Sequence, residues 1–119
     1  VTLSGRLISR FSYKNTEQPV LNWADMFERV IRLLHSEDKT VLPKLANTTD
    51  NAVDLAVYVS FNKSDLRGCS EIEEGLFIER NTSTWQKVNL LRRFFKLYNA
   101  DPSDLVFYLR DVNGDNNNE

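Results

Sequence analysis

The chain has 119 residues, 41% hydrophobic and 27% charged, with a net charge of −2, which is typical of one globular domain with its own hydrophobic core. A single cysteine, Cys69, and a single histidine, His35, exclude an intramolecular disulfide framework and a metal cluster built from these residue types. No apolar run approaches the roughly 18 residues that span a bilayer, and the first residues do not resemble a secretion signal. We therefore expect a cytoplasmic protein with no membrane contact, no metal and no other cofactor.

The first quarter of the chain predicts a hairpin followed by a helix. Apolar and polar residues alternate over 3–13, as in a half-buried strand, and a polar turn over 14–18 leads to a short second strand at 19–21. Over residues 22–36 the apolar residues recur at helical spacing, and Asn22 is suited to cap the first turn. This is the first predicted helix.

The middle of the chain is expected to contain two more strands. A short helical turn at 40–45 and a surface loop at 46–54 precede residues 55–61, which are apolar almost throughout. Such a run is typical of a central strand. Residues 62–74 are mostly polar and predict a loop, and 75–80 predict a fourth strand.

The last third predicts a second helix and a fifth strand. Ser83 and Gln86 fit a capping box at the start of a helix over residues 84–98. Asn99 can adopt the left-handed conformation that ends a helix, and 105–109 form an uncharged apolar run. Trp85 begins the expected apolar face of this helix.

The element order ββαββαβ predicts an α+β fold. We expect a two-layer sandwich in which two long helices cover one face of a mainly antiparallel sheet of about five strands. This single domain is expected over residues 1–111, with a flexible polar tail over 112–119. The first residue, Val1, is not methionine, which indicates a processed chain or a domain taken from a longer protein.

Two isolated reactive residues carry little chemistry. His35 lies in the last turn of the first predicted helix, where a capping or surface role is expected because a cation suits the helix dipole there. Cys69 lies in a polar loop far along the chain, and no pattern places it beside His35 as a nucleophile and base.

An acidic cluster near the fourth strand suggests an alternative, enzymatic function. Glu71, Glu73, Glu74 and Glu79, with Asp65, could hold Mg²⁺ and position water for phosphodiester hydrolysis. However, Arg80 follows Glu79, and the spaced lysine of a restriction-type nuclease core is missing. An exposed acidic hairpin is therefore the preferred interpretation.

A basic segment is the better functional candidate. Residues 80–110 contain six cations and two carboxylates, a balance of +4, whereas the rest of the chain sums to −6. Cations on one helix face can meet successive phosphates, and the start of a helix favours anions. The candidate nucleic-acid or anion contacts are Arg80, Asn81, Ser83, Lys87, Arg92, Arg93 and Lys96. A solvated, non-binding helix face and simple helix capping remain the alternatives.

The chain also resembles a small module at the C-terminus of larger bacterial proteins. The resemblance lies in Gly-Leu-Phe-Ile-Glu-Arg-Asn-Thr-Ser at 75–83, in Asn-Ala-Asp-Pro-Ser-Asp-Leu-Val-Phe-Tyr-Leu-Arg at 99–110, and in Asn-Trp-Ala-Asp-Met-Phe at 22–27. Those larger proteins are restriction-like or predicted nuclease proteins of defence systems, some with ParB-like or HNH domains. The resemblance implies an accessory domain beside a catalytic one, and it supplies no catalytic residue. Residues 80–82 depart from the module's usual acidic-Thr-Asn run.

The sequence thus favours a non-catalytic binding or interaction domain. DNA is one expected partner, and a catalytic domain of the same polypeptide or another protein chain is the other. A small metal-dependent phosphodiesterase or nuclease is the enzymatic alternative. A structural homodimerisation domain is the third hypothesis, because the chain contains 7 Phe, 4 Tyr and 2 Trp.

Overall fold

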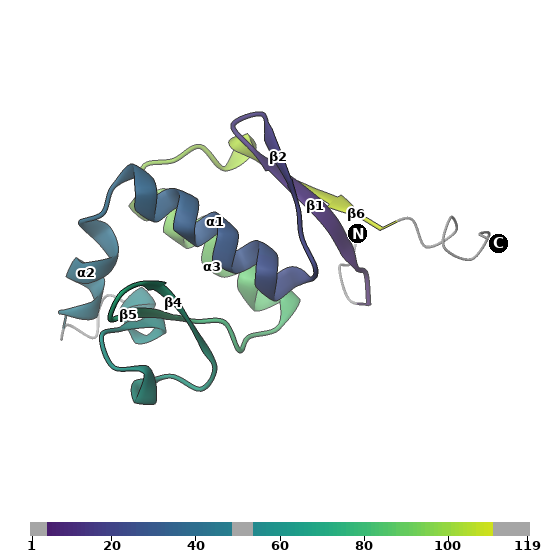
Figure 1. Ribbon diagram of the computed structural model, residues 1–119. Coiled ribbons are helices and arrows are strands. Elements are labelled where there is room, and N and C mark those ends of the chain that lie inside the picture. The colour runs from purple at the N-terminus through teal and green to yellow at the C-terminus, as the bar shows by residue number, and fades with distance from the viewer. Residues whose placement is uncertain (1–4, 49–53, 111–119) are drawn as a thin grey trace.

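The computed structural model describes residues 5–48 and 54–110, so the expected tail at 112–119 and most of the loop at 46–54 lie outside the described residues. The α+β class is confirmed (Figure 1). The single five-stranded sheet is wrong, because the strands form two separate antiparallel sheets of three strands each. The helical turn expected at 40–45 is confirmed as a third, short helix, which the element order ββαββαβ did not include.

The first sheet joins the two ends of the described chain. Its order is β2-β1-β6, with β1 (Ile8–Tyr13) between β2 (Thr16–Pro19) and β6 (Leu105–Leu109). Lys14 and Asn15 both have positive φ angles, 51° and 66°, as in the tight two-residue turns that suit the twist of a hairpin. Because this turn is shorter than the expected one at 14–18, the second strand begins at residue 16 and the prediction of a strand at 19–21 is wrong.

The second sheet has the order β3-β5-β4, with β3 at Val59–Ser60, β4 at Cys69–Glu73 and β5 at Leu76–Glu79. The predicted central strand at 55–61 is wrong. Most of it is a 3₁₀ helix, Asp54–Tyr58, and only two residues pair with β5, at the edge of the sheet. The predicted loop at 62–74 contains β4, because Ser70 and Ile72 face inward while the glutamates between and after them face outward.

Two long helices lie between the sheets (Figure 1). They are α1 (Trp23–Glu37) and α3 (Thr84–Leu97), which pack against each other, and α1 also contacts β1 and β4. The short α2 (Val41–Ala46) follows α1. One hydrophobic core joins all layers, and its largest fully buried side chains include Phe11, Phe27, Phe94 and Phe95. Burial of each such side chain contributes about 1.5–3 kcal/mol.

The predicted helix ends are confirmed. The Asn22 side chain accepts a hydrogen bond from the backbone of Asp25, and Ser83 and Gln86 form the reciprocal capping box. Asn99 has a φ of 57°. These side chains satisfy backbone groups that a helix end would otherwise leave without partners.

Within residues 5–48 and 54–110, no helix combines the length and the apolar character that crossing a membrane requires.

Candidate functional site

Lys87 is buried, contrary to the expectation that it lies on the exposed face of the second helix. Only 4% of its surface is exposed, and its Nζ donates to the carbonyl and the hydroxyl of Thr82. Burial, reinforced by nearby Arg80 and opposed by Glu79, lowers the pKa of the Lys87 ammonium. The buried face of the second helix therefore includes Lys87 and does not include Trp85, which was expected on it but is 42% exposed. Lys87 therefore secures the loop before α3 and does not point to solvent.

Three predicted contact residues precede α3 or begin it. Arg80 is exposed, and its guanidinium lies 3.9 Å from the Glu28 carboxylate. The Asn81 N–H donates to Glu79, and the Ser83 hydroxyl accepts the N–H of Gln86. The loop and the helix cap thus account for the observed contacts of these residues. Their binding role stays a prediction.

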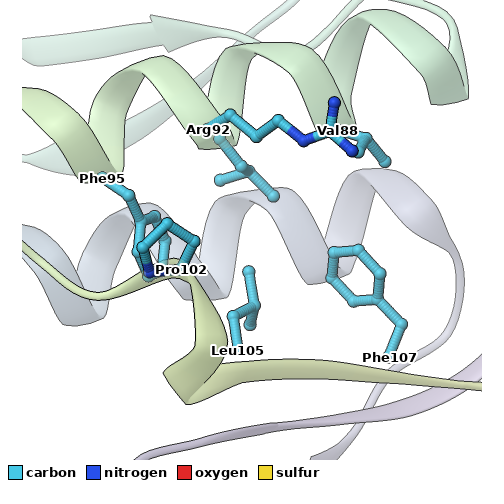
Figure 2. Close-up of a pocket in the computed structure, with 7 residues that line it drawn as sticks. Val88, Arg92, Phe95, Pro102, Leu105 and Phe107 are labelled. Carbon is cyan, nitrogen blue, oxygen red and sulfur yellow. The ribbon is translucent and has the colours of Figure 1, made fainter.

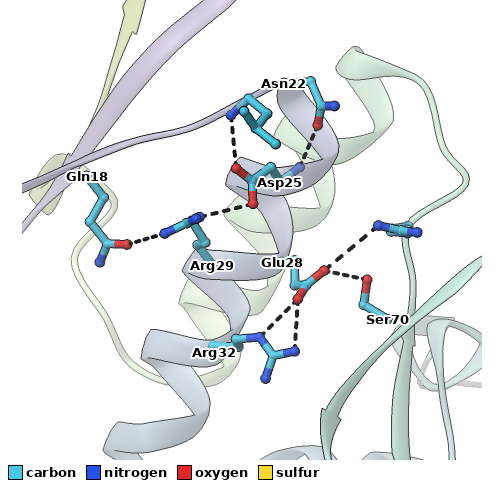
Figure 3. Close-up of polar contacts among 9 residues, drawn as sticks. Gln18, Asn22, Asp25, Glu28, Arg29, Arg32 and Ser70 are labelled. Carbon is cyan, nitrogen blue, oxygen red and sulfur yellow. Dashed lines mark hydrogen bonds and ion pairs between the residues drawn. The ribbon is translucent and has the colours of Figure 1, made fainter.

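Arg80 belongs to a polar network along α1 (Figure 3). Glu28 accepts the Ser70 hydroxyl at 2.6 Å and the guanidinium of Arg32 at 2.8 Å. Arg32 also donates to the backbone carbonyls of Glu71 and Ile72. These contacts tie α1 to β4, so the network fixes the second sheet against the helix.

Glu79 is a structural carboxylate. It is 3% exposed and accepts three backbone N–H groups, from Arg67 at 2.8 Å, Gly68 at 2.9 Å and Asn81 at 3.0 Å. Desolvation raises its pKa, but these three bonds and the charge of Arg67 outweigh it, so the net pKa of Glu79 is lowered. Glu79 holds together the loops on either side of the β4–β5 hairpin.

The other predicted metal ligands do not converge. Glu71 accepts the N–H of Gly75 at 2.8 Å, and Asp65 accepts the hydroxyl of Ser60 at 2.7 Å. Glu73 lies 2.7 Å from Nε2 of His35, and this hydrogen bond lowers the pKa of Glu73 although desolvation opposes it. Among the described residues, no three His, Cys, Asp or Glu side chains are grouped closely enough to hold a metal ion.

His35 is buried, so the expectation of a surface role is wrong. Only 4% of the residue is exposed, although it lies in the last turn of α1 as the sequence indicated. Its pairing with Glu73, on β4, links α1 to the second sheet. No sequence signal identifies this partner, because 38 residues separate the two.

Two of the predicted cations remain available on α3. Arg93 forms an ion pair with Asp54, which leaves Arg92 and Lys96. Both are exposed, and neither makes an ion pair with another residue in the described part of the chain. They are four residues apart and therefore lie on one side of the helix.

Arg92 borders an apolar groove between α3 and β6 (Figure 2). Its side chain extends along the groove toward Val88, with Leu105 and Phe107 of β6 on the opposite wall. The groove has a volume of about 160 Å³. This α3–β6 groove is lined by Val88, Leu91, Arg92, Phe95, Pro102, Leu105 and Phe107.

The strand beside this groove is an open edge. Within the described residues β6 pairs only with β1. The N–H of Lys14 donates to the carbonyl of Asp104 at 3.0 Å, and the N–H of Arg110 donates to the carbonyl of Leu7 at 2.7 Å. Because the direction of backbone groups alternates along a strand, even-numbered residues of β6 bond to β1. The backbone groups of Leu105, Phe107 and Leu109 therefore point away from β1, toward the open edge.

The sequence prediction did not identify this edge as part of the site. The sequence feature that indicates an open edge is the uncharged run Leu-Val-Phe-Tyr-Leu at 105–109. Edge strands normally carry charges, prolines or bulges that prevent further pairing, and this run has no charge and no proline. The position of this run at an edge depends on its pairing with β1, about a hundred residues earlier in the chain.

Comparison of the chain with models of protein families, with curated proteins and with solved structures found no match. The resemblance to accessory modules of restriction-like proteins stays a prediction.

Proposed function

We propose that this chain is a non-catalytic binding domain whose partner is a protein that docks on β6 and the α3–β6 groove. One observation carries the proposal. An uncharged, outward-facing strand edge lies beside an apolar groove whose rim carries an arginine with no ion pair among the described residues. An edge of this kind can pair with further chains, and aromatic and apolar surface beside an arginine is typical of protein interfaces.

The charge distribution favours a protein partner over DNA. Of the predicted phosphate contacts, Lys87 is buried, Arg93 pairs with Asp54 and Arg80 lies near Glu28. Affinity for DNA rises with the number of phosphates that cations neutralise. Arg92 and Lys96 alone would contribute little.

The acidic residues do not support the enzymatic alternative. The Glu79 carboxylate accepts three backbone N–H groups. The Glu71 carboxylate accepts the N–H of Gly75 in the hairpin turn, and Glu73 forms a hydrogen bond with the buried His35. Hydrolysis with Mg²⁺ needs carboxylates that converge on the ion and remain open to substrate. The geometry of these residues gives them structural roles instead.

The resemblance to accessory modules agrees with this proposal. In a bacterial restriction-like or defence protein, the docked partner would be a catalytic domain of the same polypeptide or of another chain. A module of this kind would recognise or position that domain and leave the chemistry to it.

Site-directed photocrosslinking in the cells that naturally produce the protein tests the proposal. A photoreactive amino acid replaces Val106, which is 42% exposed on β6. The control position is Lys63, an exposed residue of the 3₁₀ turn Lys63–Asp65. We expect a protein adduct at 106 that resists nuclease and does not form at 63. A nuclease-sensitive adduct, or equal labelling at both positions, would contradict a protein partner at β6.

A further inference from the structure

The outward-facing groups of β6 form a regular row of donors and acceptors. The N–H of Leu105 donates to Pro102, which leaves the carbonyl of Leu105 and both backbone groups of Phe107 and Leu109 directed to the open edge. This is the pattern that an added antiparallel strand would meet with its own N–H and C=O groups. The edge can therefore bind backbone, whatever the partner's side chains are.

The groove sets which side chains the added strand would carry. Leu105 and Phe107 direct their side chains to the helix layer and line the groove, and residues paired directly opposite in an antiparallel sheet share a face. Side chains opposite these two would therefore point into the space between β6 and α3. Apolar walls from Val88, Leu91 and Phe95 favour aliphatic side chains there.

The cations set the charge of the partner. Arg92 lies over the groove, and Lys96 lies near Arg92 around a neighbouring hollow. Asp101 and Pro102 also line this hollow, and the Asp101 carboxylate accepts the N–H and the hydroxyl of Ser103. Lys96 is at the end of the groove where β6 begins, and the guanidinium of Arg92 lies farther along the groove, beside Val88 and above Phe107. An antiparallel strand passes the stretch from Phe107 to Leu105 with its C-terminal half, so acidic side chains in that half would be attracted to the two cations.

A second copy of the chain fits this surface less well. Its β6 segment would offer no carboxylate within Leu105–Leu109. In a two-fold antiparallel pairing of strands, both helix layers also lie on the same face of the joined sheet. The α3 helix of the second copy would therefore approach the space between β6 and α3 of the first copy. A single extended segment avoids this conflict.

Building on the protein-binding function proposed above, we infer that β6 receives an extended segment of the partner as a fourth strand of the first sheet. The segment runs antiparallel to β6, directs alternate aliphatic side chains into the α3–β6 groove, and carries one or two acidic residues in its C-terminal half. Main-chain bonds supply affinity, and the groove with Arg92 supplies selectivity.

Titration with synthetic peptides, followed by the amide NMR signals of the domain, tests this inference. The probe is a capped nine-residue peptide of alternating valine and threonine that ends in two glutamates. Three matched control peptides are used. The first carries the two glutamates at its N-terminal end, and the second ends in two lysines in their place. The third carries N-methyl groups on the alternate residues whose N–H groups would face β6. We expect saturable shifts at 105–109 and along α3, binding about fivefold weaker for either charge control, and no binding of the methylated peptide.

Variants of the domain complete the test. Arg92→Glu should weaken binding of the glutamate peptide and strengthen binding of the lysine peptide, whereas Lys63→Glu, the same charge change at a distant exposed residue, should leave both unchanged. The strand-addition model would be overturned if no amide signals of β6 shifted, or if the peptide affinity did not change on methylation or in Arg92→Glu. Concentration-dependent self-association through β6 would identify a second copy as the occupant and also overturn it. A protein crosslink at 106 together with any of these failures would leave the protein-binding function standing.

Discussion

The strands β2 and β6 are the two edges of the same sheet, on either side of β1, and they differ in how they meet solvent. β2 has the sequence Thr-Glu-Gln-Pro: its glutamate pairs with Arg10 at 2.9 Å, and Pro19 has no N–H to offer. β6 has the sequence Leu-Val-Phe-Tyr-Leu, with neither charge nor proline. One edge is closed to further pairing, and the other is open.

The edges of the second sheet resemble β2 more than β6. β3 has only two residues, and β4 carries Glu71 and Glu73 on its outward side. Short length and charge are the usual means of preventing edge pairing. Of the four edges in the described structure, β6 alone lacks these protections, which is why a partner strand is expected there.

The largest expected change in the free energy of unfolding comes from truncating a buried residue of β1, the strand that pairs with both edge strands of the first sheet. Phe11 of β1 is fully buried and faces Gln18 of β2 and Phe107 of β6 in the strand register. Phe11→Ala should lower the free energy of unfolding by about 3–5 kcal/mol, measured by urea denaturation. Amide exchange should accelerate at both edges together. A loss no larger than the roughly 0.5 kcal/mol expected of surface substitutions such as Thr16→Ala would mean that the edges do not depend on this core residue.

A smaller effect, dependent on pH, should come from the second sheet. Glu79→Gln should cost about 2 kcal/mol of unfolding free energy at pH 7, because a charged acceptor of three N–H groups is lost. The net pKa of Glu79 is lowered on folding, since those bonds outweigh desolvation. Its stabilisation is therefore present above the unfolded value near 4.3 and is lost as pH falls through the lower folded pKa.

The unfolding free energies of the wild type and of Glu79→Gln should therefore converge in acid. Denaturation at pH 7 and pH 3 measures this, with Glu74→Gln, at an exposed hairpin position, as the matched control. A gap that stays constant with pH would contradict the structural role of the carboxylate. Because the open edge is a property of the first sheet, peptide binding at β6 should be the same in this variant at pH 7.

Local signals explain which parts of the fold were predictable from the sequence. Both long helices agree with prediction to within one residue at each end, because the caps at Asn22 and Ser83 and the helical spacing act over a few residues. The strand at 105–109 is confirmed for the same reason. The division into two sheets was not predictable, since it depends on β6 returning to β1 across nearly the whole chain.

The candidate site shows the same limit. The exposure of Arg92 and Lys96 follows from helical spacing, but the pairing of Arg93 with Asp54 joins residues 39 positions apart. Helical spacing alone does not predict the burial of Lys87, because its aliphatic chain lies along the core while its ammonium reaches Thr82, just before the helix. The run at 55–61 does not form the predicted strand, because an apolar stretch fits a short 3₁₀ helix as well as a strand.

The smallest expected change in stability comes from closing the open edge. Val106→Lys places a charge at the centre of β6 on the outer face of the sheet, where the valine is 42% exposed, and should change the free energy of unfolding by less than about 0.5 kcal/mol. Aggregation on mild heating, followed by light scattering, should nevertheless slow markedly, since unprotected apolar edges nucleate pairing between chains. Thr16→Lys adds the same charge to β2, which is already protected, and should leave aggregation unchanged. Equal slowing by both lysines would show that net charge, and not the open edge of β6, controls association.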